Sequence, residues 1–246
     1  MSEQAPMTWE QALKEKAQEQ AMRKAALSTG PKYVSFKSGI LSIDKIPIPN
    51  NTLDVVVLNF MSENAYYKGR FDPTKPQTPV CWSVYADEAS MVPNEDAAEI
   101  QAEKCSECPM FKWGSDPMGG RGKACKTRIR LGLLPATFSE PSDVLVAELR
   151  FGTLPVTSGK DFDSFVTKCN NLFGLPTFAV IASLSVVPDP KNQFKVVLEP
   201  KERLSPEYFE GILKRLSEAE TGITYPYQDL EDEQPAAATA KSAKKL

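Results

Sequence analysis

The chain has 246 residues, of which 41% are hydrophobic, so it can bury the core of one large domain or of a medium domain with ordered arms. Its formal net charge of −3 excludes a polycation, so a polyanion would have to be bound by a local concentration of positive charge. The absence of histidine excludes Ser-His-Asp and Cys-His nucleophile pairs and histidine-ligated catalytic metals. We therefore expect a binding protein rather than an enzyme.

The first residues indicate a helical arm. The start, Met1-Ser-Glu-Gln-Ala5, is polar and resembles no signal peptide, and no apolar run approaches membrane length. We therefore expect a cytoplasmic protein without membrane contacts, whose thiols stay reduced. A helix is predicted over residues 8–27, because Thr8 and Gln11 form a capping box and Gly30-Pro31 ends the pattern.

Short β-branched and aromatic runs begin near residue 32, separated by Gly, Pro and Asn. They predict strands over residues 33–36, 40–43, 53–60, 65–68, 80–85, 127–134 and 144–150. A helix is predicted over 159–173, then a hairpin of 178–187 with 194–198, and a last helix from Ser205 to about Ala219. Strands in hairpins with one helix between the later ones favour a mostly β protein with flanking helices, built as a Greek-key barrel of OB type.

Four of the five cysteines lie between residues 81 and 125: Cys81, Cys105, Cys108 and Cys125. The C-x-x-C spacing of Cys105 and Cys108 lets two thiolates hold one ion, and four thiolates suit a closed, structural zinc site. Two alternatives stay open. The thiols could be buried and unconnected, or the pair could be a redox motif, although it lies in a Gly/Pro-rich loop. Cys169, on a predicted helix, is expected to be a small buried hydrophobe.

A basic stretch with aromatic residues and glycines follows the C-x-x-C pair. Between residues 112 and 130, six basic residues accompany a single acid, Asp116. Cations neutralise phosphates, aromatic faces stack on bases, and glycines let a ligand approach the backbone. The expected DNA-binding side chains are Lys112, Trp113, Arg121, Lys123, Lys126, Arg128, Arg130, Tyr66 and Tyr67. The alternative is a solvated basic loop with Trp113 packed against the metal knuckle.

Strand alternation refines this set. Over residues 127–134 it places Arg128 and Arg130 on the outward face of the strand. Tyr66 and Tyr67 are adjacent, so they face opposite sides and at most one of them reaches the ligand. Trp82, beside a proposed metal ligand, is expected to be structural.

Several short motifs lie between residues 79 and 134. They are Cys81-Trp-Ser, Cys105-Ser-Glu-Cys-Pro109, Trp113-Gly-Ser, Gly120-Arg-Gly-Lys-Ala-Cys-Lys126 and Arg128-Ile-Arg-Leu131. Together they resemble a family of single-stranded DNA-binding proteins encoded by tailed bacteriophages, which carry a zinc knuckle within an OB-like fold. The resemblance implies that the four cysteines bind zinc and that the Gly-Lys-Ala-Cys-Lys turn lies against the DNA.

The expected organisation has three parts: an N-terminal helical arm (1–30), an OB-like DNA-binding domain (31–220) with a zinc-binding insertion at about 79–130, and a disordered tail (221–246). Acidic tails in such proteins recruit replication or recombination partners. Here the acidic run at 229–233 is followed by lysines, which departs from that pattern.

We therefore expect a non-enzymatic single-stranded DNA-binding protein that acts in phage DNA replication or recombination, in the cytoplasm of the host cell. The sequence leaves its oligomeric state open. One alternative is a zinc-ribbon protein-interaction or transcription accessory factor, and a more distant one is a carboxylate-dependent nuclease.

Overall fold

The computed structural model describes residues 8, 9, 12, 13, 16, 17, 19, 20, 32–69, 77–87, 90–117, 119–225 and 227. The chain divides into two units, residues 1–31 and 32–246. In the first unit, the described residues from Trp9 to Gln20 are helical, as predicted, and residues 21–27 of the predicted helix lie outside the described residues. None of the helices in the described ranges combines the length and the apolar composition that a membrane span requires.

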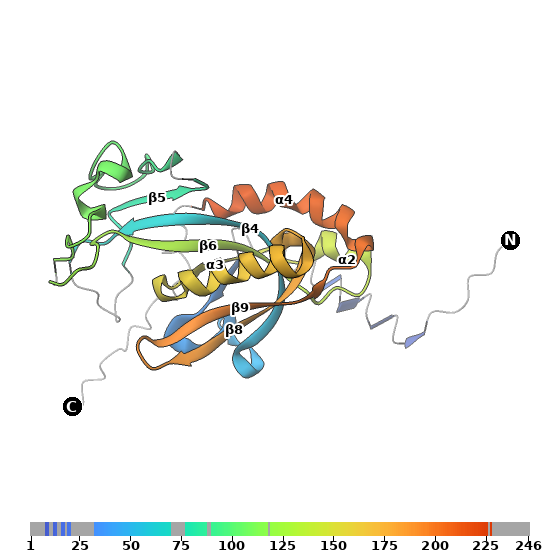
Figure 1. The fold of residues 1–246 in the computed structure, drawn as a ribbon. Coiled ribbons are helices and arrows are strands. Elements are labelled where there is room, and N and C mark those ends of the chain that lie inside the picture. The colour runs from blue at the N-terminus through green and yellow to red at the C-terminus, as the bar shows by residue number, and fades with distance from the viewer. Residues whose placement is uncertain are drawn as a thin grey trace, which may run out of the picture. The chain divides into compact units, whose positions relative to one another are not determined.

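The second unit is mostly β, as predicted. Its strands are β1 (Lys32–Ser35), β2 (Ser42–Ile43), β3 (Ile46–Pro47), β4 (Thr52–Tyr66), β5 (Cys81–Tyr85), β6 (Lys126–Pro135), β7 (Arg150–Leu154), β8 (Val180–Asp189) and β9 (Gln193–Arg203). They form one curled mixed sheet, a half-barrel, in the order β3-β2-β1-β7-β6-β4-β8-β9, and β5 pairs with β4 (Figure 1). The β1–β7 pair is parallel, and the other pairs are antiparallel.

Helices cover both faces of this sheet. The α-helices of the second unit are α2 (Pro141–Val146), α3 (Gly159–Lys168) and α4 (Phe209–Ile223). The shorter helical turns are η1 (Lys37–Gly39), η2 (Pro49–Asn51), η4 (Cys105–Glu107), η5 (Pro109–Phe111), η6 (Val156–Ser158), η7 (Cys169–Phe173), η8 (Thr177–Ala179) and η9 (Pro206–Tyr208). Figure 1 shows α4 along one side of β4 and β6, with α3 on the other side.

The long strand β4 organises the sheet. Its first half pairs with β8, its second half pairs with β5 on the same edge, and β6 runs along the opposite edge. A bulge between Val57 and Asn59 interrupts the pairing with β6. On the inner face, Val55 and Leu131 belong to the core that α3 completes, and on the outer face Val56 belongs to the core under α4. Residues on either face of β6 can therefore be buried.

Two expected elements differ from the structure. Residues 144–150 were predicted as a strand, but residues 141–146 form α2, because Pro141 occupies its first turn and Glu140 and Asp143 make a capping box. The predicted strands 53–60 and 65–68 are parts of the single strand β4, which ends at Tyr66.

The C-terminal boundary also differs. Helix α4 continues to Ile223, and Tyr225 is buried beneath it, so residues 221–225 belong to the folded body rather than to a disordered tail. Residues 228–246, which hold the acidic run at 229–233, lie outside the described residues.

Candidate nucleic-acid interface

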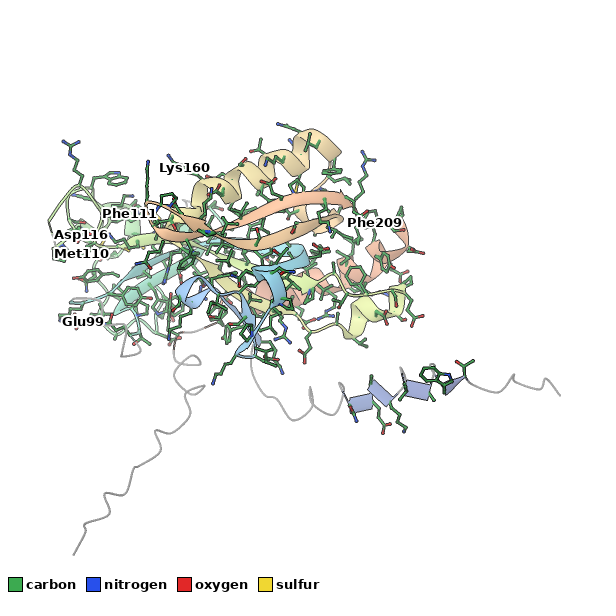
Figure 2. The ribbon with its side chains drawn as sticks, turned by 90° about the horizontal axis from the view of Figure 1, so that it is seen from below. Glu99, Met110, Phe111, Asp116, Lys160 and Phe209 are labelled. Carbon is green, nitrogen blue, oxygen red and sulfur yellow. The ribbon has the colours of Figure 1, made fainter. Side chains whose placement is uncertain are left out.

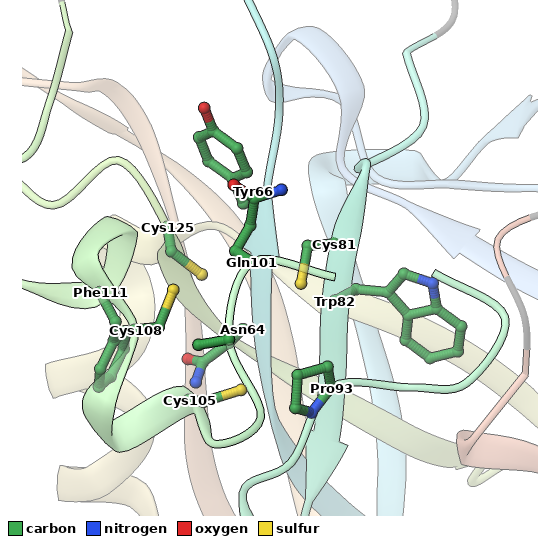
Figure 3. A pocket seen from close by; sticks show the side chains of 11 residues that line it. Asn64, Tyr66, Cys81, Trp82, Pro93, Gln101, Cys105, Cys108, Phe111 and Cys125 are labelled. Atoms are coloured by element: carbon green, nitrogen blue, oxygen red, sulfur yellow. The ribbon is translucent and has the colours of Figure 1, made fainter. Parts of the chain in front are cut away.

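Four cysteine side chains line one small cavity at the β5 end of the sheet (Figure 3). Cys81 begins β5, Cys105 begins η4, Cys108 lies between η4 and η5, and Cys125 immediately precedes β6. All four are buried. The backbone N–H of Cys125 donates to the carbonyl oxygen of Met110 at 2.8 Å, which holds the inserted loop near the start of β6.

The structure does not support the expected zinc ion. Within the described ranges, no group of three or more His, Cys, Asp or Glu side chains is placed to hold a metal ion, so the assignment of Cys81, Cys105, Cys108 and Cys125 as zinc ligands is wrong. Sequence spacing brings thiols near one another, but it does not decide whether they converge on one point. All five cysteines are free, and burial, followed by the neighbouring thiols, raises the pKa of Cys125 to about 12.

Hydrogen bonds close the loop between Met110 and Cys125. The N–H of Gly114 donates to the carbonyl oxygen of Gly122 at 2.9 Å. The hydroxyl of Ser115 accepts from the N–H of Ala124 at 2.9 Å, and its single hydrogen is shared between the carbonyl oxygens of Lys112 at 2.6 Å and Met110 at 2.9 Å. Residues 113 and 123 flank the Gly114–Gly122 bond, so the closure brings Trp113 and Lys123 side by side.

An aromatic and cationic cluster lies on this closed loop. The ammonium nitrogen of Lys123 is 3.6 Å from the centre of the Phe111 ring and 5.2 Å from that of Trp113. The Trp113 side chain is 77% exposed, and Lys112 and Arg121 are also exposed. Figure 2 labels Phe111 at this end of the body. The structure thus brings four of the expected DNA-binding residues together on one exposed loop.

Lys126, the first residue of β6, borders this loop and has a partner. Its ammonium lies 2.8 Å from a carboxylate oxygen of Asp116, and both side chains are partly exposed. Such a pair is screened by solvent and contributes at most about 1 kcal/mol, so Lys126 remains available to a phosphate that competes with Asp116.

Arg130 was expected to be exposed, but its side chain is 0% exposed. Its Nη2 and Nε donate to Oε1 of Glu63 at 2.6 and 2.9 Å, and its Nη1 donates to the carbonyl oxygen of Tyr225 at 2.7 Å. The strand does point Arg130 to the face opposite the α3 core, but α4 and the segment after it cover that face. The expectation that Arg130 is exposed to solvent and contacts DNA is therefore wrong.

Arg128 lies at the margin of the same buried network. Its Nη2 donates to the hydroxyls of Tyr67 at 2.9 Å and Tyr227 at 2.6 Å, and it lies 3.1 Å from the second Glu63 oxygen. Burial is the largest single influence and lowers the pKa of Arg128, but the combined interactions with Glu63, Tyr227 and Tyr67 outweigh it, so the pKa is raised. Arg128 and Tyr67 therefore have partners within the buried network.

The remaining aromatic residues, Tyr66, Tyr67 and Trp82, lie in different surroundings. Tyr66 lines the cysteine cavity, whereas the adjacent Tyr67 meets Arg128, so the two face different surroundings. Trp82 is buried, and its ring packs edge-to-face on Tyr227 with centroids 5.5 Å apart. Sequence reasoning missed Glu63 as the organiser of this network, although an acid within a long, mostly buried strand is a usable signal.

No protein-family model matches the chain, and no curated protein or solved structure matches it either. A functional assignment therefore rests on the geometry of the chain's own residues.

Proposed function

We propose that this chain binds single-stranded DNA, with little sequence preference, through the loop between β5 and β6. The observation that carries the proposal is the exposed ring of Trp113 beside the ammonium of Lys123. One exposed apolar side chain is ordinary on a protein surface. Trp113 differs because a lysine borders its face and Lys112 and Arg121 lie exposed on the same loop.

Each part of this cluster suits one part of a single strand. The indole face offers stacking, which is worth about 1–3 kcal/mol per base and works with any base because every base has a π-face. The cations offer phosphate neutralisation, which dominates affinity and makes it salt-dependent. In a duplex the base faces are already stacked on one another, so the aromatic contribution favours single strands.

The strand connections support an OB-like fold as part of the proposal. The spatial order β8-β4-β6-β7 is that of a Greek key, in which the fourth strand returns beside the first. With α3 before β8, and β9 after it, this order supports a five-stranded OB barrel as the proposed fold. The edge of β7 pairs with β1, however, so the sheet is not closed by a β7–β9 pair.

The position of the cysteine-rich loop fits the same proposal. It lies between β5 and β6, within the longer connection from β4 to β6, and in the proposed OB barrel β4 and β6 take the places of the first and second strands. In OB folds this connection is one of the loops that bind oligonucleotides. A role in phage DNA replication or recombination would follow, and that part rests on the motif resemblance alone.

Fluorescence anisotropy tests the proposal with labelled oligo-dT and a duplex of equal length at two salt concentrations. We expect tighter binding to the single strand and a loss of affinity as salt rises. Equal affinity for both forms would contradict a stacking site. Binding to neither would favour the alternative, a protein-interaction module.

A further inference from the structure

A second cavity opens near the same end of the body. It has a volume of about 220 Å³ and lies among the end of β4, the start of β6 and the beginning of α3. Ile129 and Val156 supply apolar walls, and Ser62, Thr127 and Asp163 supply polar groups. Arg128 also lines the cavity, but its guanidinium is paired with Glu63, so its charge is already compensated. Sites for drug-sized ligands have about 300–1,000 Å³, so this cavity suits a smaller fragment.

The polar groups favour a base over a phosphate. The hydroxyl of Thr127 donates to the side-chain oxygen of Asn64 at 2.8 Å, which leaves the Thr127 oxygen as an acceptor. The carboxylate of Asp163 is also an acceptor, is exposed, and has no ion pair among the described residues. Acceptors match the ring N–H and amino groups of nucleobases, whereas a carboxylate repels a phosphate.

The cavity is close to the aromatic loop along the chain. Thr127 follows Lys123 by four residues, which span at most about 14 Å of extended chain. In Figure 2, Lys160, which follows Gly159 at the start of α3, lies at the same end of the body as Phe111. A strand stacked on Trp113 can therefore reach the cavity within a few nucleotides.

We infer that this cavity receives one nucleobase of the bound strand, turned out of the stack, and that Asp163 and Thr127 accept its hydrogen bonds. The inference rests on the proposed single-stranded DNA binding. It assigns a base-binding position separate from the stacking face of Trp113.

Gly159 allows the cavity to be filled without disturbing the backbone. Its φ of −57° and ψ of −46° are helical, so any L-residue fits. A Cβ built there meets no atom within 4 Å. Gly159→Trp should therefore occupy the cavity from its wall, and Gly159→Ala is the matched control.

Affinities for oligo-dC, which carries an amino group on every base, are measured for the full-length wild-type chain and both variants, together with their melting temperatures. We expect Gly159→Ala to bind like wild type and Gly159→Trp to bind at least about fivefold more weakly. Equal affinity of Gly159→Trp and Gly159→Ala overturns the base position and leaves the proposed function standing. No binding by wild type overturns both. If Gly159→Trp lowers the melting temperature, Gly159→Leu is judged by the same criterion.

Discussion

The ammonium of Lys123 lies 3.6 Å from the centre of the Phe111 ring. Phe111 is half-buried and packs on the small core of Tyr85, Met91 and Cys105. The ring therefore anchors the lysine through a cation–π contact while the neighbouring ring of Trp113 stays exposed. This arrangement fixes a cation beside a free aromatic face, so a stacked base and its phosphate could be bound together.

Replacement of Trp113 by alanine should weaken binding to oligo-dT by about 5- to 150-fold, because stacking contributes about 1–3 kcal/mol per base. The melting temperature should stay near that of wild type, since the side chain is 77% exposed. Anisotropy titration and thermal unfolding measure the two quantities. Trp9→Ala is the matched control, because Trp9 is 71% exposed but belongs to the first unit. A folded Trp113→Ala variant with wild-type affinity would remove this residue from the site.

Replacement of Lys123 by alanine should change the salt dependence of binding. Each phosphate contact contributes about −0.7 to the log–log slope for single strands, so the slope should become shallower by about that amount. Titrations at several salt concentrations give the slope. Lys214→Ala is the control, because Lys214 is an exposed lysine of α4 paired with Glu210. Slopes that coincide for wild type and Lys123→Ala would mean that Lys123 neutralises no phosphate.

The strands that the sequence predicted best are those with local signals. The β8–β9 hairpin has alternating apolar residues on both sides of a turn, and its strands pair from Val180 to Arg203 with one register shift, between Ile181 and Ala182. The prediction of a strand over residues 144–150 failed because Val144 and Val146 have the spacing of a strand. The signals that decide for a helix, Pro141 and the capping pair, lie at the beginning of α2. The three partners of β4 depend on distant segments, which no local pattern specifies.

The sequence predicted the candidate site correctly only for the loop between β5 and β6. Composition alone placed Trp113, Lys123 and the exposed cations together. Alternation correctly assigned Arg130 to one face of its strand, but it could not say what covers that face. The covering groups include the carbonyl of Ile223, which is 93 residues away along the chain. The zinc expectation failed for a similar reason, because spacing does not fix the convergence of side chains.

Replacement of Glu63 by glutamine should destabilise the protein strongly. Glu63 is 0% exposed and is the carboxylate partner of both Arg128 and Arg130. Removal of its charge leaves buried guanidinium groups uncompensated, which costs about 3–5 kcal/mol of the free energy of unfolding. Urea denaturation measures this loss. Glu99→Gln is the control, since Glu99 forms an exposed pair with Lys68 that solvent screens. A similar small loss in both variants would show that the buried network is not formed.

The buried thiol of Cys169 should make the free energy of unfolding fall as the pH rises. It is 1% exposed, and burial raises its pKa to about 11. An unfolded thiol has a pKa of about 8.5, so the folded chain holds this proton more tightly. The contribution of this protonated thiol to the free energy of unfolding is therefore complete below about pH 8.5. It is lost, at up to about 1.4 kcal/mol per pH unit, as the pH rises towards the folded pKa. Urea unfolding of wild type and Cys169→Ala across this range should show a flatter profile for the variant. Parallel profiles would contradict a buried, protonated thiol.

Photocrosslinking of the wild-type chain to oligonucleotides that carry 5-iodouracil locates the bound strand most directly. Peptide mass spectrometry then identifies the attachment points. The account predicts adducts on the loop from Phe111 to Lys123, with Trp113 foremost, and their loss when unlabelled oligo-dT is added in excess. Adducts confined to α2 and α4, with none on this loop, would contradict the proposed interface.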